Sequence, residues 1–327
     1  MDTSHRIPVT LERCSDYTPE NVERALECAL APLGGMAALL GDARRVILKT
    51  NFLTPGPAAD GHTTHPAVVE AVAKSVLACG ERRVVIADSP AMGSARRVAR
   101  RNGVGEVARR LGIEIWSLNQ PRRVDLPPGE AEWRHLVIDR RLIEPGTRII
   151  NLPKAKVHGQ MYVTLAIKNL FGAICGKRKP LWHVSVDADR VRFGRMLVWL
   201  HRVIQPALHV IDCIDAMERK GPRGGDMRRV GLIAASCDAA ALDRVIVEVL
   251  GLDPERHHAL VAARQLGMGA TELDEISVLG EAIDAVRVEG FQEARQTDLA
   301  FHIPRPLRFL MLRVLMRGVP QHDHRPS

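Results

Sequence analysis

INLPKAKVHGQMYVTLAIKNLFGAICGKRKPLWH, residues 150–183, carries five of the eight lysines in this 327-residue chain. The other 38 of the 46 lysine and arginine residues are arginines, so the chain switches from arginine to lysine in this stretch. It begins at the end of a β-branched strand pattern near 147–152 and continues into an apolar run, 161–176, that is typical of a helix. A strand followed by a helix is the unit from which α/β folds are built.

Outward from this stretch, strand and helix patterns alternate along the chain. Strands are expected within 44–51, 82–90, 111–118, 207–215, 230–238 and 274–281, and helices within 18–34, 65–80, 94–111 and 239–252. This alternation predicts an α/β fold, a mostly parallel sheet with helices on both faces. We expect residues 1–300 to form one such unit, with a possible subdomain boundary near 150–205. Residues 301–327 would then form a basic amphipathic helix and tail.

Polar side chains follow five of the expected strands, at the point where each strand ends. These residues are Lys49 and Asn51, Asp88 and Ser89, Lys154, Lys156 and His158, Asp212 and Asp215, and Ser236 and Asp238. Because ligands of open parallel sheets bind outside the carboxyl ends of the strands, we expect these groups to share one crevice. Polar residues at strand ends also serve as simple turn formers, which is the alternative for any one of them.

The lysine-rich stretch predicts chemistry that a guanidinium does not supply. An ammonium is a compact charge that loses its proton when buried, so lysine acts as a base or neutralises an anion. Lys168 lies in an apolar context on a helix expected to be half buried, so it needs a partner or a shifted pKa. His158 and His183 bracket it and are candidates for acid–base or ligand roles. Lys177 and Lys179 are expected to be ordinary loop charges.

Thr64 and His65 precede Pro66, the expected first residue of a helix. They would either hold an anion at the helix N-terminus or only cap the helix. Asp212, with its neighbour Asp215, would bind a divalent cation or pair with the lysines. GVGEVA, 103–108, follows a charged helical pattern instead of a strand, so it is not a dinucleotide site.

Composition excludes several classes of protein. The six cysteines form no CxxC pair, so neither a zinc ribbon nor an iron–sulfur cluster is encoded. No apolar run reaches membrane-spanning length, and the N-terminus lacks an apolar signal core, which predicts a cytoplasmic protein. A net charge of +8 favours anionic partners, but aromatic residues make up only 4%, which makes nucleic acid unlikely as a partner. The basic amphipathic pattern at 304–320 would contact an anionic membrane, dock a partner or pack on its own domain.

These motifs resemble a broad prokaryotic family, domain-of-unknown-function family 362. The resemblance spans about residues 9–280 and rests on LKTNF…TTHPAVVEAV, VVIADSP, INLPKAKVH…VTLAIKNLFGAICG…H, VIDCIDAMERKGPRGG and AASCDAAALDRVIVEVLGLDP. By this match, the family's characteristic polar positions fall on Lys49, Asn51, Thr64, His65, Asp88, Lys154, Lys156, His158, Lys168, Asn169 and His183. Many members carry a ferredoxin module, whose cysteines this chain lacks. A more distant likeness is to the nickel-pincer lactate racemase family, in which a lysine near a glycine-rich loop precedes a histidine.

The leading hypothesis is an enzyme that acts on a small carboxylate or phosphate by Lys/His acid–base chemistry, as an isomerase, racemase or lyase does. Lys168, His158 and Asp88 would be catalytic. Substrate would contact Lys49, Asn51, Thr64, His65, Lys154, Lys156 and Asn169. A divalent metal held by His183 and Asp212 would assist. The alternative is a redox-associated or metallocofactor-handling accessory protein. The sequence names neither the substrate nor the oligomeric state.

Overall fold

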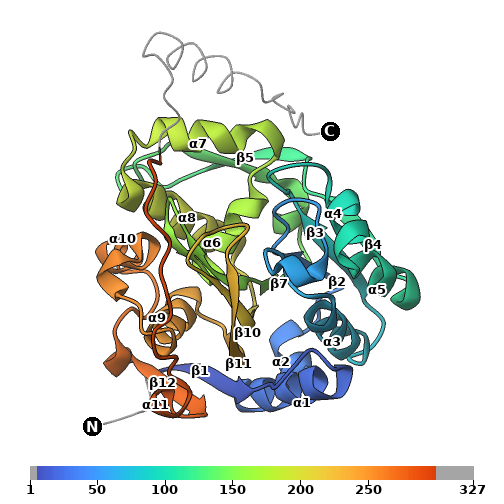
Figure 1. Ribbon diagram of the computed structural model, residues 1–327. Helices are drawn as coiled ribbons and strands as arrows, with labels where there is room; N and C mark the ends of the chain where they lie inside the picture. Colours follow the sequence, from blue (N-terminus) through green and yellow to red (C-terminus); the bar gives the residue numbers. More distant parts are fainter. Residues whose placement is uncertain (1–5, 300–327) are drawn as a thin grey trace, which may run out of the picture.

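A ten-stranded mixed sheet forms the centre of the protein in a computed structural model that describes residues 6–299 (Figure 1). Its main path runs β12-β1-β11-β10-β7-β2-β3-β4, β8 pairs with β10, and β9 pairs with β8. A separate hairpin joins β5 to β6. The strands are β1 Ile7–Arg13, β2 Arg45–Thr50, β3 Arg83–Asp88, β4 Glu114–Ser117, β5 Pro121–Asp125, β6 His135–Asp139, β7 Thr147–Leu152, β8 Lys154–His158, β9 Tyr162–Thr164, β10 Leu208–Glu218, β11 Asp226–Ser236 and β12 Ile276–Gly280.

Most neighbouring strands of this sheet run parallel. The pairs β10–β7, β7–β2, β2–β3 and β3–β4 are all parallel, as are β10–β8 and β1–β12. Strand β11 is antiparallel to both of its neighbours, and β9 is antiparallel to β8. The predicted α/β class with a mostly parallel sheet is confirmed. The carboxyl ends of β2, β3 and β7 therefore meet at one edge.

Helices cover both faces of the sheet, as predicted (Figure 1). Alternate residues of β2 show the two faces, because Val46 and Leu48 pack with α1, α3, α4 and α5, whereas Ile47 packs with α8, α9 and α10. Each fully buried aliphatic side chain contributes roughly 2 kcal/mol. The helices are α1 Pro19–Leu30, α2 Gly35–Leu40, α3 Pro66–Leu77, α4 Ala95–Asn102, α5 Val104–Leu111, α6 Ala166–Asn169, α7 Lys179–Ser185, α8 Arg190–Ile204, α9 Ala239–Val249, α10 His258–Leu266 and α11 Ile283–Val286.

The prediction of one helix over 161–176 is wrong. The chain instead forms β9, the single turn α6 and a 3-10 turn, η4 (Leu170–Ala173). Tertiary contacts decide this, since β9 pairs with β8 across a hairpin and the carboxylate of Asp243 accepts hydrogen bonds from the Ala166 and Ile167 amides. The helix expected over 94–111 is two helices, α4 and α5. They are separated by Gly103, whose φ of 93° no α-helix contains.

The chain returns to the β8–β9 hairpin after α11. The Thr297 amide donates to the Gly159 carbonyl at 2.7 Å, and Arg190 donates to the Thr297 carbonyl at 2.9 Å. The predicted basic helix and tail, 301–327, lies outside the described residues. The single unit over 1–300 and the subdomain boundary near 150–205 stay predictions.

Candidate functional site

A pocket of about 1080 Å³ opens at the carboxyl ends of β2, β3 and β8. Its walls also include the loop after β3, the β8–β9 hairpin, the α6–η4 turns and α7. Such a crevice is where ligands of parallel sheets bind. The structure brings eight of the predicted site residues into its lining, namely Lys49, Asn51, Asp88, Lys156, His158, Lys168, Asn169 and His183.

The floor of the pocket holds a buried ion pair between adjacent strand ends. The Nζ of Lys49, on β2, lies 2.9 Å from Oδ1 of Asp88, on β3, and both side chains are fully buried. Asp88 also accepts hydrogen bonds from the Phe52 and Ser89 amides, both at 2.6 Å. Gly172 covers this pair so closely that a Cβ there would lie 2.3 Å from the carboxylate and 2.4 Å from Nζ of Lys49. The pair therefore joins the ends of β2 and β3 at the pocket floor, and three donors already occupy its carboxylate.

Lys156, from β8, projects into the same floor without a carboxylate partner. Its Nζ donates to Oδ1 of Asn51 and to the His62 carbonyl, both at 2.5 Å. Burial, followed by the neighbouring charges of Lys168 and Lys154, lowers the pKa of Lys156 well below its ordinary value. A buried lysine that faces only neutral acceptors loses its proton readily, and a negative charge nearby would hold it in the ammonium form.

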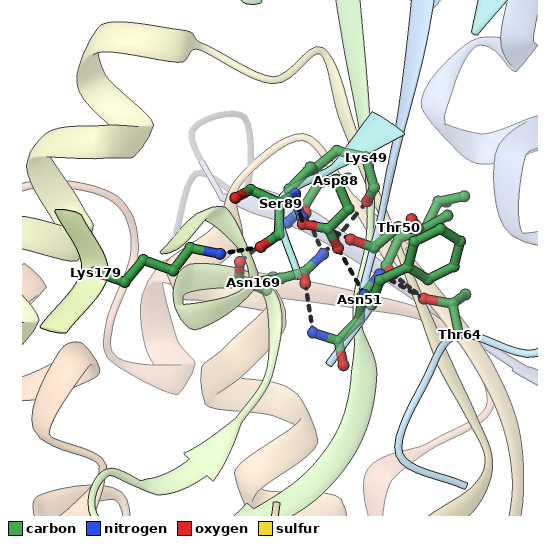
Figure 2. Close-up of polar contacts among 12 residues, drawn as sticks. Lys49, Thr50, Asn51, Thr64, Asp88, Ser89, Asn169 and Lys179 are labelled. Atoms are coloured by element: carbon green, nitrogen blue, oxygen red, sulfur yellow. Dashed lines mark hydrogen bonds and ion pairs between the residues drawn. The ribbon is translucent and has the colours of Figure 1, made fainter. Parts of the chain in front are cut away.

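A chain of side-chain amides fixes the orientation of Asn51 (Figure 2). Asn51 donates to Oδ1 of Asn169 at 2.7 Å, and Asn169 donates to Oδ1 of Asn151 at 2.8 Å. Nδ2 of Asn151 lies 3.0 Å from Nδ1 of His209. Burial lowers the pKa of His209 well below its ordinary value and so keeps its imidazole neutral. Every amide in this chain donates in the same direction, away from Lys156. The carbonyl oxygen of Asn51 is therefore the atom that faces the ammonium.

Lys168 and Lys179 flank the ring of Phe171. Their Nζ atoms lie 6.0 and 5.8 Å from the ring centroid. Burial lowers the pKa of both to about 8, and the charge of Lys179 contributes to the lowering at Lys168. Within residues 6–299 the ammonium of Lys168 makes neither a hydrogen bond nor an ion pair. An accessible lysine that is half deprotonated near pH 8 is suited to proton transfer.

Lys179 was expected to be a loop charge, and that expectation is wrong. It begins α7, lines the pocket and donates to the Ser89 carbonyl, as Figure 2 shows. Ser89 follows β3, far away in the sequence. The sequence signal that could have identified Lys179 is the lysine enrichment itself, because it belongs to the same group of five.

His158 faces the pocket in one defined tautomer. Its Nδ1 accepts hydrogen bonds from the Gln160 amide at 3.1 Å and the Met161 amide at 3.3 Å. The proton of the neutral ring is thus on Nε2. Burial and the charges of Lys168 and Lys156 lower the pKa of His158 well below its ordinary value. The ring is consequently a hydrogen-bond donor to the pocket. The Thr164 hydroxyl, on the strand position opposite Lys156, also lines the pocket, is buried and has no partner within the described residues.

His183, on α7, closes the pocket against aromatic rings. Its ring centroid lies 5.7 Å from that of Phe171 and 4.8 Å from that of Phe193. Burial, then the charge of Lys168, lowers its pKa to about 4. The side chain is neutral at physiological pH.

The other four predicted site residues lie outside the pocket lining, and three of them, Lys154, Asp212 and His65, form a separate cluster. Lys154 donates to Asp212 at 2.8 Å and to the Tyr17 hydroxyl at 2.7 Å. His65 stacks on Tyr17 at 3.7 Å and caps α3 by accepting from the Ala67 amide. Thr64 instead contacts a pocket residue, since its hydroxyl accepts from the Asn51 amide at 2.8 Å and donates to the Leu152 carbonyl at 2.7 Å. The contacts of Lys154, Asp212 and His65 satisfy their cluster internally, which is the capping and ion-pairing alternative raised for these residues.

The described residues offer no metal site. Between residues 6 and 299 no group of three or more His, Cys, Asp or Glu side chains is arranged to hold a metal ion. His183 lines the pocket, whereas Asp212 belongs to the Lys154 cluster, so the structure does not bring this predicted pair together. The donor set of the pocket is cationic, which suits an anion better than a metal ion.

The fold and the pocket define an α/β protein with a lysine-lined crevice at the strand ends. Residues 46–248 match the family described as "Domain of unknown function (DUF362)". A thylakoid-associated protein of Synechocystis sp. is 36% identical over 316 residues, which cover 97% of each chain. The chain therefore belongs to the DUF362 family, as its motifs predict.

A solved structure shares part of the fold. The lactate racemase apoprotein of Thermoanaerobacterium thermosaccharolyticum aligns with a TM-score of 0.50 at 11% identity. The match covers 74% of this chain and 57% of the racemase chain, so this chain spans little more than half of that protein. The likeness extends to the α/β fold alone. Among residues 6–299, no helix is both long enough and apolar enough to cross a membrane.

Replacement of Lys49 by Met should destabilise the protein by roughly 3–5 kcal/mol, because Asp88 is left buried and unpaired. Lys74→Met is the matched control, since Lys74 pairs with Glu23 at 2.7 Å on an exposed surface. That substitution should cost less than about 1 kcal/mol. Urea unfolding followed by circular dichroism measures both. Equal losses in the two variants would contradict the structural role of the Lys49–Asp88 pair.

Stability should fall as the pH falls from 7.5 to 5.0. Burial lowers the pKa of His65, His183 and His258 to about 4, against about 6.5 in the unfolded chain. Below pH 6.5 the unfolded state therefore binds protons that the folded state does not. The free energy of unfolding should drop by up to about 1.4 kcal/mol per pH unit for each such histidine. An unchanged urea midpoint at the two pH values would show that these imidazoles are not held neutral.

Proposed function

We propose that the protein is an enzyme that binds a small anionic molecule in this pocket and moves a proton on it. The observation that carries the proposal is Lys168, whose ammonium has no partner among residues 6–299 and whose pKa burial lowers to about 8. Roughly a tenth of such lysines are neutral at pH 7, which provides a base near the working pH. Other lysines around it attract the anion.

The surrounding groups support a specific reaction class, proton abstraction next to a carbonyl or carboxylate group. Removal of that proton places negative charge on an oxygen of the substrate. The Nε2–H of His158 and the Nζ–H of Lys156 both face the pocket and would donate to this oxygen. Donors fixed in place before the reaction stabilise such charge effectively. Racemases, isomerases and lyases share this step.

The roles within the site differ from those expected from sequence. His158 would donate a hydrogen bond and would not act as the base, because two backbone amides occupy Nδ1. Asp88 would not move a proton, since its carboxylate is bound to Lys49 and two amides. Lys179 would keep the pKa of Lys168 low by charge repulsion.

The reaction is testable by exchange of carbon-bound hydrogen. A panel of 2-hydroxy acids, dicarboxylates and phosphorylated acids is incubated in D2O, and loss of Cα–H signals is followed by NMR. Lys168→Met should reduce exchange at least 100-fold, with Lys74→Met as the matched control. The exchange rate should rise with pH and level off above about pH 8. Lys179→Met should move that rise to higher pH, because it removes a positive charge next to Lys168. Wild-type exchange in Lys168→Met would refute the proposal.

We further infer a cytoplasmic protein that contacts the membrane surface through residues 304–320. The thylakoid association in the name of the Synechocystis relative supports this inference. So does the sequence PRPLRFLMLRVLMRGVP, which combines apolar Leu307, Leu310 and Leu315 with four arginines.

Co-sedimentation with lipid vesicles tests the membrane contact. The full chain should bind phosphatidylglycerol vesicles and release them in high salt, because anionic lipid contributes about 1 kcal/mol per basic residue. A variant with Leu307, Leu310 and Leu315 changed to Gln should bind at least tenfold more weakly. Equal binding to pure phosphatidylcholine vesicles, or full binding by the variant, would contradict it.

A further inference from the structure

The pocket contains more positive than negative charge. Four lysines line it, Lys49, Lys156, Lys168 and Lys179, and Asp88 is the only acid among its described lining residues. Asp88 pairs with Lys49 and accepts two amide hydrogen bonds besides. One charge of each sign is thus cancelled, and three lysines are left without a carboxylate partner in the described lining.

The Nζ of each of these three lysines contacts only neutral groups. Lys156 donates to an amide oxygen and a carbonyl, Lys179 donates to a carbonyl, and Lys168 lies over the Phe171 ring. The two histidines of the pocket, His158 and His183, add no negative charge. By contrast, Lys154 outside the pocket has its own carboxylate at 2.8 Å. The protein therefore pairs Lys154 and Lys49 with carboxylates and leaves Lys156, Lys168 and Lys179 of the pocket without one.

We propose that the ligand of this pocket carries at least two negative charges, as a dicarboxylate or a phosphate monoester does. The inference rests on the proposed function, since it specifies the anion that the enzyme would act on. Moving charges out of water is costly unless an opposite charge accompanies them. A ligand with one charge leaves two of the three ammonium groups uncompensated. Monocarboxylates of the lactate type are therefore poor ligands.

Other contacts in the pocket fit a second acidic group on the ligand. The Thr164 hydroxyl is buried and lacks a partner within residues 6–299, and the Nε2–H of His158 is available as a donor. Phe52, Leu53 and Pro180 provide apolar walls for the carbon skeleton. The pocket thus has donors for two acidic groups and space for the atoms between them.

Proton uptake accompanies the binding of such a ligand. The charged groups that face one another are Lys49, Asp88, Lys156, Lys168 and Lys179, with His158 and His183 neutral. Burial lowers the pKa of Lys168 and Lys179 to about 8 and that of Lys156 well below its ordinary value, so all three are partly deprotonated at pH 8.5. A bound dianion favours their charged forms and raises all three pKa values. The complex therefore takes up protons from the buffer.

Malonate and malonamate, its monoamide, form a matched pair of probes that differ by one charge at nearly the same shape. Isothermal titration calorimetry at pH 8.5 and fixed ionic strength, in two buffers of different ionisation enthalpy, measures both affinity and proton uptake. We expect malonate to bind at least tenfold more tightly than malonamate and to take up protons. Inorganic phosphate should behave like malonate. Equal affinities for malonate and malonamate, or no detectable binding of malonate and phosphate, would overturn the proposal.

Lysine variants show which residues cause the preference for malonate. Lys168→Met and Lys179→Met should each weaken malonate at least tenfold and reduce its advantage over malonamate, whereas Lys74→Met should leave both affinities unchanged. Thermal unfolding by circular dichroism identifies any variant that fails to fold, and Lys→Gln at the same position then replaces it. If the wild-type protein exchanges no proton but still prefers malonate, the proposed enzyme activity is refuted and the preference for a dianionic ligand is kept. If it exchanges protons on monocarboxylates and binds malonate and malonamate equally, the activity is kept and the preference for a dianion is refuted.

Discussion

The buried pair between Lys49 and Asp88 is the constraint on which the site depends. It joins the carboxyl ends of β2 and β3 and occupies the only carboxylate in the described lining of the pocket. Gly172 brings the η4 turn directly over it, where any side chain would collide with both partners. Because this carboxylate already accepts from Lys49 and two amides, Lys156, Lys168 and Lys179 have no carboxylate partner of their own in the described lining. The same contact that stabilises the strand ends thus creates the electrostatic character of the pocket.

Strand β8 shows how two lysines two positions apart acquire different roles. Lys154 pairs in register with Asp212 of β10 and donates to its carboxylate, so its charge is neutralised inside the fold. The register then shifts, and Lys156 pairs opposite Met217. Without a carboxylate opposite it, Lys156 is held by Asn51 and the His62 carbonyl at the floor of the pocket. The irregular register separates a lysine paired with a carboxylate from a lysine that lines the pocket without one.

Sequence patterns predicted the sheet, the helices on both faces and the polar groups at the strand ends, because period-2 burial and strand-to-loop transitions are local properties. They also predicted Lys49, Asn51, Asp88, Lys156 and Lys168 as one group, which the structure brings to one pocket. They did not predict the strand β9, since its pairing with β8 overrode an apolar pattern that resembles a helix. They placed His65 and Lys154 with the others, although Tyr17 and Asp212 hold them in a separate cluster.

The sequence by itself determined the class of fold, the family and the concentration of lysine in one stretch, because these depend only on residue types and their spacing. Only the tertiary structure decided which lysines lack a counter-charge, since that depends on which carboxylates reach them. It also decided the tautomer of His158, which two backbone amides of the hairpin turn fix. Lys179 lies in the site because it donates to the Ser89 carbonyl, about ninety residues earlier in the chain. No local sequence pattern predicts a contact between residues so far apart.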